Sequence, residues 1–197
     1  MSAATVQLLT AKEFARLPSP SDGSRLELER GEVIKVSQPR HLHGRTQLRI
    51  GHTIESFLGP NPIGHATSGS GILTESDPDT VRGPDLAYWS IERLPLDADP
   101  ELYTSVPPDL AIEILSPSNT PRQMVKKIKE YFQHGVRMVW IVDADFRSVT
   151  VYRKPGKGTI LWEDELVSGE DVLPGFSCRV GDLFPPVATK KAPENPA

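Results

Sequence analysis

The hydrophobic pattern is clearest in the second half of the chain. Residues 110–115 read Leu-Ala-Ile-Glu-Ile-Leu and are bounded by Pro-Pro-Asp and Ser-Pro-Ser. A short apolar run between turn residues is typical of a strand buried on both faces, near the middle of a sheet. Apolar positions then recur at helical spacing and predict a helix that ends at His134-Gly135. Its apolar stripe consists of Met124, Val125, Ile128, Tyr131 and Phe132.

The first third of the chain predicts two more helices and a hairpin. Thr10, followed three residues later by Glu13, is typical of a capping box at the start of a short helix. Residues 26–36 alternate around Gly31 as the two strands of a hairpin do. Apolar residues at helical spacing predict a second long helix over residues 46–58, which Gly-Pro-Asn-Pro ends.

The remaining pattern favours strands and loops. Outside one short strand, residues 63–81 are rich in Gly, Ser and Thr and predict a loop, and residues 95–108 carry four prolines and predict a surface loop. The whole predicts an α/β or α+β fold with a mixed sheet flanked by helices. The predicted strands are Ile72–Thr74, Asp85–Ser90, Met138–Asp143, Ser148–Arg153 and Thr159–Trp162.

Composition narrows the class of protein. The 197 residues are 38% hydrophobic and 24% charged, which is typical of a soluble globular protein. We expect one domain over residues 1–187 and a disordered tail over residues 188–197. The single cysteine, Cys178, excludes an intramolecular disulfide. The densest apolar run, Met138–Val142, is too short to cross a bilayer, so we expect a cytoplasmic protein with no membrane partner.

The net charge limits the ways in which the chain could bind nucleic acid. Twenty-two Lys and Arg face 26 Asp and Glu, giving a formal charge of -4. That is the wrong sign for holding nucleic acid by bulk electrostatics. Phosphate binding would therefore need a local basic patch or a metal ion in an acidic pocket.

Glu113 is an acidic residue within the buried strand. It shares one face with Asp109, Ala111 and Leu115, because side chains alternate along a strand. A buried carboxylate needs a cation or hydrogen-bond donors, so Glu113 predicts either a salt bridge or a metal site, and composition alone favours the salt bridge. Asp85 begins the preceding strand and could bring a second carboxylate close enough to hold Mg²⁺ or Mn²⁺, although an aspartate there could also cap a turn.

Three lysines follow on the predicted helix. Lys127 and Lys129 border opposite margins of the apolar stripe, so periodicity does not choose between them. Lys126 faces outward, as a solvated charge does. Asp109, four residues before Glu113, is interpreted as a strand-entry residue.

Seven segments between about Thr10 and Phe184 form a distinctive series. They are Glu27-Leu-Glu-Arg-Gly-Glu, His43-Gly-Arg, Gly83-Pro-Asp-Leu-Ala, Pro108-Asp-Leu-Ala-Ile-Glu-Ile-Leu-Ser-Pro-Ser, Lys127-Ile-Lys-Glu-Tyr, Gly135-Val-Arg-Met-Val-Trp-Ile-Val-Asp and Leu173-Pro-Gly-Phe. In this order they resemble the Uma-type restriction endonucleases, a family of the PD-(D/E)xK nuclease superfamily. The resemblance implies a restriction-endonuclease-like fold with a mixed central sheet, and a metal-dependent endonuclease that hydrolyses DNA.

By position, the resemblance assigns catalytic roles to Asp85, Glu113 and Lys127. The superfamily lysine stands two residues after the glutamate, where this chain has Leu115; Lys127 matches a lysine supplied by the following helix instead. The leading hypothesis is that Asp85, Glu113 and the backbone carbonyl of Ile114 hold Mg²⁺ or Mn²⁺ while Lys127 orients the attacking water.

Two further positions match the family, each with alternatives. Glu27 could assist the metal, or be solvated or paired with an arginine. His43 could contact a phosphate, but packing or capping is the preferred interpretation.

Two other functions stay open on the sequence alone. A nuclease-like module without activity could bind nucleic acid or serve in assembly, and a purely structural homodimer would show an apolar patch and no pocket. In a competent site Asp85, Glu113 and Lys127 should converge on one pocket open to solvent. A homodimer is expected for an active enzyme, since two sites related by a twofold axis can cut both strands of a duplex.

Overall fold

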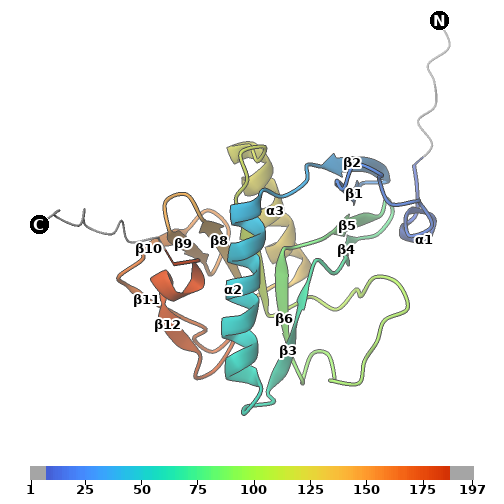
Figure 1. Cartoon of the computed structure of the whole chain (residues 1–197). Helices are drawn as coiled ribbons and strands as arrows, with labels where there is room; N and C mark the ends of the chain where they lie inside the picture. Colours follow the sequence, from blue (N-terminus) through green and yellow to red (C-terminus); the bar gives the residue numbers. More distant parts are fainter. Residues whose placement is uncertain (1–7, 187–197) are drawn as a thin grey trace, which may run out of the picture.

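The computed structural model describes residues 8–186 and contains a six-stranded, a four-stranded and a two-stranded sheet (Figure 1). The predicted disordered tail at 188–197 lies outside the described residues. In the large sheet, β7 and β8 run parallel and every other neighbouring pair runs antiparallel, which confirms the predicted mixed sheet. Its strands in spatial order are β10 (Gly158–Trp162), β9 (Ser148–Tyr152), β8 (Met138–Asp143), β7 (Leu110–Ile114), β6 (Leu86–Ser90) and β3 (Gly64–Ser68).

Strand β7 is buried along its whole length between β6 and β8, as its apolar run predicted. The side chains of Leu110, Ile112 and Ile114 belong to the larger hydrophobic core, while Ala111 belongs to a second core on the other face. Glu113 therefore lies on the face of the second core.

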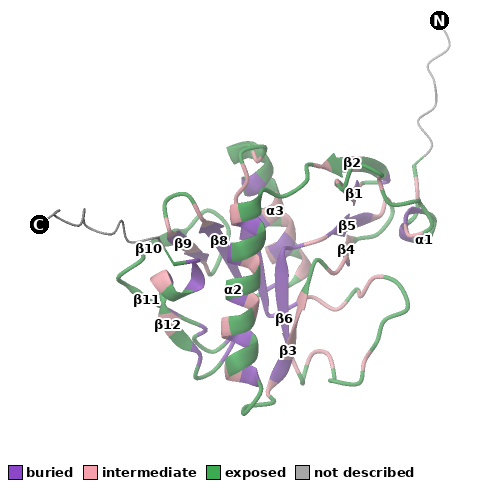
Figure 2. Cartoon of the chain, viewed as in Figure 1, coloured by how far each residue is buried: buried purple, intermediate pink, exposed green. Residues whose placement is uncertain are grey.

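Helices α2 (His41–Leu58) and α3 (Pro121–His134) cover opposite faces of the large sheet (Figures 1 and 2). Helix α3 buries Met124, Ile128 and Tyr131 against Ala111, and its N-terminus carries a capping box between Thr120 and Gln123. Within residues 8–186, no helix combines the length and the apolar content needed to cross a membrane. The α2 face is completed by β11 (Leu166–Ser168), β12 (Ser177–Arg179) and the 3₁₀ helix η1 (Val180–Leu183).

The four-stranded sheet lies beside α3 (Figure 1). Helix α1 (Ala11–Phe14) packs Phe14 against this sheet, and Thr10 and Glu13 form the predicted capping box. The sheet contains the predicted hairpin, and it brings residues 25–29 close to the middle of α3. Its strands in spatial order are β2 (Glu32–Val36), β1 (Arg25–Glu29), β5 (Thr80–Arg82) and β4 (Ile72–Glu75).

The structure contains β11, β12 and η1, for which the sequence pattern predicted no element, and it also departs from that pattern at α2 and in residues 63–81. Helix α2 begins at His41, before the predicted start at Thr46. Its first turn has no apolar periodicity, and His43 within it contacts the side chain of Asp85. The predicted loop over residues 63–81 contains β3 and β5, whose strand conformation comes from pairing with β6 and β1. Loop 95–108 is confirmed as a loop, although Tyr103 within it packs against Phe14.

Candidate active site

The antiparallel pairing of β6 and β7 brings the predicted acidic residues together. Leu86 lies opposite Ile112, so the start of β6 is next to the end of β7. Asp85 precedes β6, and Glu113 lies near the end of β7. Both line one small cavity, together with Lys127 from α3 and His43 from α2. The space open to the centre of a water molecule is about 20 Å³, enough for about one water.

Asp85 is fixed by three donors. Its Oδ2 atom accepts a hydrogen bond from the backbone N–H of Ile114 at 2.8 Å and lies 3.1 Å from Nε2 of His43. Its Oδ1 atom accepts from a guanidinium nitrogen of Arg25 at 2.9 Å. Asp85 is 1% exposed and is therefore a buried ionic centre, not the cap of a surface turn.

The chain around Asp85 interrupts the β-ladder. Continuing the β6–β7 register places Ile114 opposite Pro84. Proline has no N–H, so Pro84 cannot donate to the carbonyl of Ile114. The Ile114 N–H instead bonds to the Asp85 side chain. Ile114 lines the cavity, and this break leaves its carbonyl with no ladder donor from Pro84.

Glu113 receives two hydrogen bonds on one oxygen. The Tyr131 hydroxyl donates to Oε1 at 2.6 Å, and Nζ of Lys127 donates to the same atom at 3.1 Å. The Oε2 atom accepts no hydrogen bond from the residues that the structure describes. Of the two alternatives for Glu113, the salt bridge is thus present, and one oxygen remains available for a further ligand.

Lys127 bridges two glutamates. Its Nζ atom also donates to Oε1 of Glu27 at 2.7 Å. Lys126 instead pairs with Glu29, and Lys129 is exposed. Tertiary contacts therefore distinguish the lysines that helical periodicity left equivalent, and they place Lys127 at Glu113.

Glu27 is paired with an arginine, one of the alternatives weighed above. Its Oε2 atom accepts from Arg82 at 3.0 Å, while Lys127 occupies Oε1. Arg82 is 2% exposed and also bonds to Glu29 and Glu130, both at 2.7 Å. The Glu27 carboxylate thus holds Lys127 in place, and both of its oxygens are taken.

The environment drives the pKa values of the two cavity carboxyls apart. Burial opposes ionisation of Asp85, but the hydrogen bond and charge of His43, the N–H of Ile114 and the charge of Arg25 hold its pKa below the ordinary value. Burial raises the pKa of Glu113 against the charge of Lys127, and Asp85 adds to the increase. Asp85 is therefore the more acidic carboxyl of the pair.

The basic and phenolic partners keep their protons. Burial works against the charged form of Lys127, but Glu113 and Glu27 outweigh it and raise the pKa of Lys127. Burial and the charge of Glu113 raise the pKa of Tyr131 well above its ordinary value. Both groups therefore act as hydrogen-bond donors near neutral pH.

The donor set fits a hard divalent cation. Residues 8–186 contain no cluster of three or more His, Cys, Asp or Glu side chains suited to a metal ion. Two carboxylates do line the cavity, and Mg²⁺ commonly binds through one or two carboxylates while keeping several waters. Oε2 of Glu113 and the second lone pair of Asp85 Oδ1 are the oxygens available to it.

Several residues of the site were not predicted. Arg25 precedes Glu27 by two positions on β1, so strand alternation could have placed both on one face. Tyr131 was assigned only to the apolar stripe, and no sequence signal marked Arg82 as the partner of Glu27. Asp109, in contrast, is the predicted strand-entry residue and bonds to Arg93, Arg137 and the Ser90 N–H, away from the cavity.

Comparisons with known proteins bear on the fold and on the class of protein. Residues 11–181 match the family model Uma2, described as "Putative restriction endonuclease". The chain is also similar to the crystal structure of a putative nuclease belonging to DUF820 from Anabaena variabilis ATCC 29413. The sequence identity is 27% and the TM-score 0.75, over 89% of this chain and 97% of that one. No curated protein matches significantly. The matches confirm the predicted restriction-endonuclease-like fold and support a nuclease role.

Proposed function

Because this chain belongs to the Uma2 family of restriction endonucleases, we propose that it is a metal-dependent endonuclease that hydrolyses DNA phosphodiester bonds. The observation that carries the proposal is that Asp85, Glu113 and Lys127, from three separate elements, line one cavity. A retired site would be plugged, or would have these side chains splayed apart. Here Lys127 and Glu113 are in direct contact.

Asp85, Glu113 and the Ile114 carbonyl would hold Mg²⁺ or Mn²⁺. When bound, the ion supplies polarisation of the scissile phosphate and a lower pKa for a coordinated water. The protein keeps the Asp85 carboxylate ionised through His43 and the Ile114 N–H. His43 is thus a positioning residue for Asp85.

Lys127 would act as a donor. Its ammonium has three N–H groups, of which two bond to Glu27 and Glu113. The third is free to hold the attacking water or a phosphate oxygen. Because the pKa of Lys127 is raised, the ammonium stabilises developing negative charge and does not take a proton from water. Glu27 fixes the amine against Glu113.

The finer expectations belong to the same proposal. We expect a cytoplasmic enzyme that acts as a homodimer, because two sites related by a twofold axis can cut both strands. A local site of this kind also accounts for nucleic-acid binding by a chain of net charge -4. The single domain over residues 1–187 stays a prediction.

Cleavage of a supercoiled plasmid tests the proposal. The purified chain should nick or linearise the plasmid with Mg²⁺ or Mn²⁺ and be inactive in EDTA. Glu113→Gln should lose at least about 100-fold of this activity while keeping its thermal unfolding transition. Glu92→Gln, which changes an exposed glutamate, is the matched control. A wild-type chain that cuts neither DNA nor RNA but binds them would be the inactive binding module instead.

A further inference from the structure

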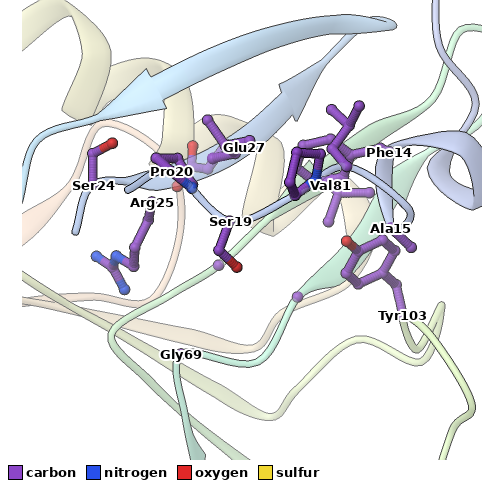
Figure 3. A pocket seen from close by; sticks show the side chains of 15 residues that line it. Phe14, Ala15, Ser19, Pro20, Ser24, Arg25, Glu27, Gly69, Val81 and Tyr103 are labelled. Atoms are coloured by element: carbon purple, nitrogen blue, oxygen red, sulfur yellow. The ribbon is translucent and has the colours of Figure 1, made fainter. Parts of the chain in front are cut away.

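A second, larger cavity shares Arg25 with the small cavity that Asp85 lines. Its volume for water-sized groups is about 340 Å³, within the range of pockets that bind small molecules. It is lined by residues of α1, β1, loop 95–108 and the turns around β4 and β5. Figure 3 shows Arg25 and Tyr103 at opposite ends of this cavity, with Ser19 between them.

Strand β1 connects this cavity to the candidate active site. Arg25 and Glu27 lie two positions apart and therefore on one face of the strand. Both line the large cavity, while Arg25 bonds to Asp85 and Glu27 bonds to Lys127. A ligand in the large cavity would therefore lie beside the site where the phosphodiester is cut.

Arg25 has donors to spare at this boundary. A guanidinium carries five N–H groups, and within residues 8–186 Arg25 makes one hydrogen bond, to Asp85. Its side chain is 37% exposed. The remaining N–H groups have the planar geometry that suits a phosphate.

The backbone at Gly69 and Gly83 faces open space. A Cβ atom at Gly69 would meet nothing within 4 Å, and one at Gly83 would meet only the Gly69 carbonyl oxygen at 4.0 Å. Both glycines line the cavity. The Gly69 N–H bonds to the carbonyl of Asp85 at 3.2 Å, and main chain without a side chain lets a ligand approach the remaining backbone polar groups directly.

Tyr103 forms an aromatic wall with a free hydroxyl. A Cβ atom at Gly71 would come within 2.4 Å of the Tyr103 ring, so the missing side chain lets the ring pack on the backbone. The ring centroid lies 5.9 Å from that of Phe14. In the part of the chain that the structure describes, the Tyr103 hydroxyl bonds to no other group. A held aromatic ring with an unused hydroxyl is suited to stacking on a nucleobase and hydrogen bonding to it.

We propose that this cavity binds one nucleotide of the substrate strand, with its base against Tyr103 and its phosphate on Arg25. The position of that nucleotide next to the cut rests on the proposed nuclease function. Binding of the nucleotide itself does not, because it needs only the cavity.

Titration of the full chain with deoxyadenosine 5′-monophosphate tests the cavity without any cleavage. Calorimetry should show binding that Tyr103→Ala weakens by about 10-fold, the loss expected for one stacked base. Deoxyribose 5-phosphate, which has no base, should bind wild type and Tyr103→Ala equally weakly. Tyr152→Ala, a matched change in a half-buried tyrosine on β9 outside this cavity, should leave binding unchanged.

A second variant tests the same cavity if Tyr103→Ala does not fold. Ser19 is exposed at the rim, and Ser19→Trp should fill the entrance and abolish nucleotide binding while circular dichroism shows the native fold. No binding to the wild-type chain, or equal binding by wild type, Tyr103→Ala and Ser19→Trp, would overturn the proposal.

Cleavage of oligonucleotides that carry a single abasic site then tests which nucleotide of the strand occupies the cavity. Wild-type cleavage should fall when the abasic site is at one position beside the cut, and Tyr103→Ala should remove that dependence. Cleavage that ignores the position of the abasic site would overturn the nucleotide site and leave the nuclease function standing. Nucleotide binding to a chain that cuts no nucleic acid would overturn the nuclease function and leave the cavity's ligand standing.

Discussion

Oε1 of Glu27 accepts a hydrogen bond from Nζ of Lys127 at 2.7 Å, although the two residues are 100 positions apart in the chain. The other oxygen of Glu27 binds Arg82. Lys127 therefore links Glu113 to a series of alternating charges that extends into the four-stranded sheet. Because every member is paired, the loss of one charge should affect its neighbours.

Replacing Lys127 by methionine should cost both stability and activity. The change leaves the buried carboxylates of Glu27 and Glu113 with no ammonium between them, so the free energy of unfolding should fall by about 3 kcal/mol. Plasmid cleavage should fall at least about 100-fold. Urea denaturation and the plasmid assay measure the two effects, with Lys129→Met as the exposed control on the same helix.

Adding Glu113→Gln to Lys127→Met should separate the two roles. The double variant should recover part of the lost stability, because Lys127 is the one cation paired with Glu113 among the described residues and that uncompensated charge is gone, but it should recover no cleavage. If Lys127→Met has the same free energy of unfolding and the same plasmid cleavage as the wild type, the amine contributes to neither stability nor activity.

Arg82, on the four-stranded sheet, should contribute strongly to the stability of the protein. Its guanidinium bonds to three glutamates while 2% exposed, so Arg82→Met should lower the free energy of unfolding by about 3–5 kcal/mol. Arg82→Lys should recover only a fraction of the lost free energy of unfolding, because a lysine ammonium cannot reproduce the guanidinium's hydrogen bonds to three glutamates. Arg30→Met, on an exposed side chain, should change stability by less than about 1 kcal/mol in the same urea titration. Equal losses for Arg82→Met and Arg30→Met would contradict this assignment.

Asp85 and Glu113 should give stability profiles with opposite dependence on pH. The folded pKa of Asp85 is lowered from 3.8, so its ionisation adds stability that is present above pH 3.8 and lost as the pH falls through the folded pKa. The folded pKa of Glu113 is raised from 4.5, so its contribution is present below pH 4.5 and lost as the pH rises through the folded pKa.

Denaturation of the wild type, Asp85→Asn and Glu113→Gln across this pH range tests both signs. The stability of the wild type relative to Asp85→Asn should increase with pH, and relative to Glu113→Gln it should decrease. Slopes of the same sign would show that one of the two pKa shifts is wrongly assigned.

Asp109 should affect stability without affecting chemistry. It shares a strand face with Glu113 but is 1% exposed among Arg93, Arg137 and the Ser90 N–H. Asp109→Ala should lower the free energy of unfolding by about 3 kcal/mol, because it leaves two arginines without their carboxylate. The cleavage rate per folded molecule, measured below the unfolding transition, should equal that of the wild type. A lost cleavage rate in a folded variant would place Asp109 in the site.

The elements with strong periodicity could be predicted from the sequence, and those held by pairing could not. Strand β7 and helix α3 follow their apolar patterns, because burial on two faces or on one stripe determines them. Strand β3 reads Gly-His-Ala-Thr-Ser and has no alternation; its conformation depends on hydrogen bonds to β6. The early start of α2 likewise depends on contacts made by His43 with Asp85.

In the candidate site, too, some residues could be predicted from the sequence pattern and others depend on tertiary contacts. Asp85 and Glu113 could be proposed as neighbours from two strands alone, since a charge in a buried strand needs a partner. Lys127 could not be separated from Lys129 by helical spacing, because the choice depends on where the hairpin places Glu27. Arg82 gave no distinguishing pattern. Strand alternation could have placed Arg25 on the face of Glu27, but its partner Asp85 depends on a tertiary contact.

Placing the amine on α3 and the acids on strands has a consequence for how such proteins can diverge. Residues 115–120 connect β7 to α3, and a connection of another length would preserve the arrangement wherever the helix docks in the same place. Descendants of one ancestor could then keep the same three-dimensional arrangement while their linear spacing drifts. Related proteins should therefore share the three-dimensional arrangement of the two acids and the amine more closely than the sequence spacing between them.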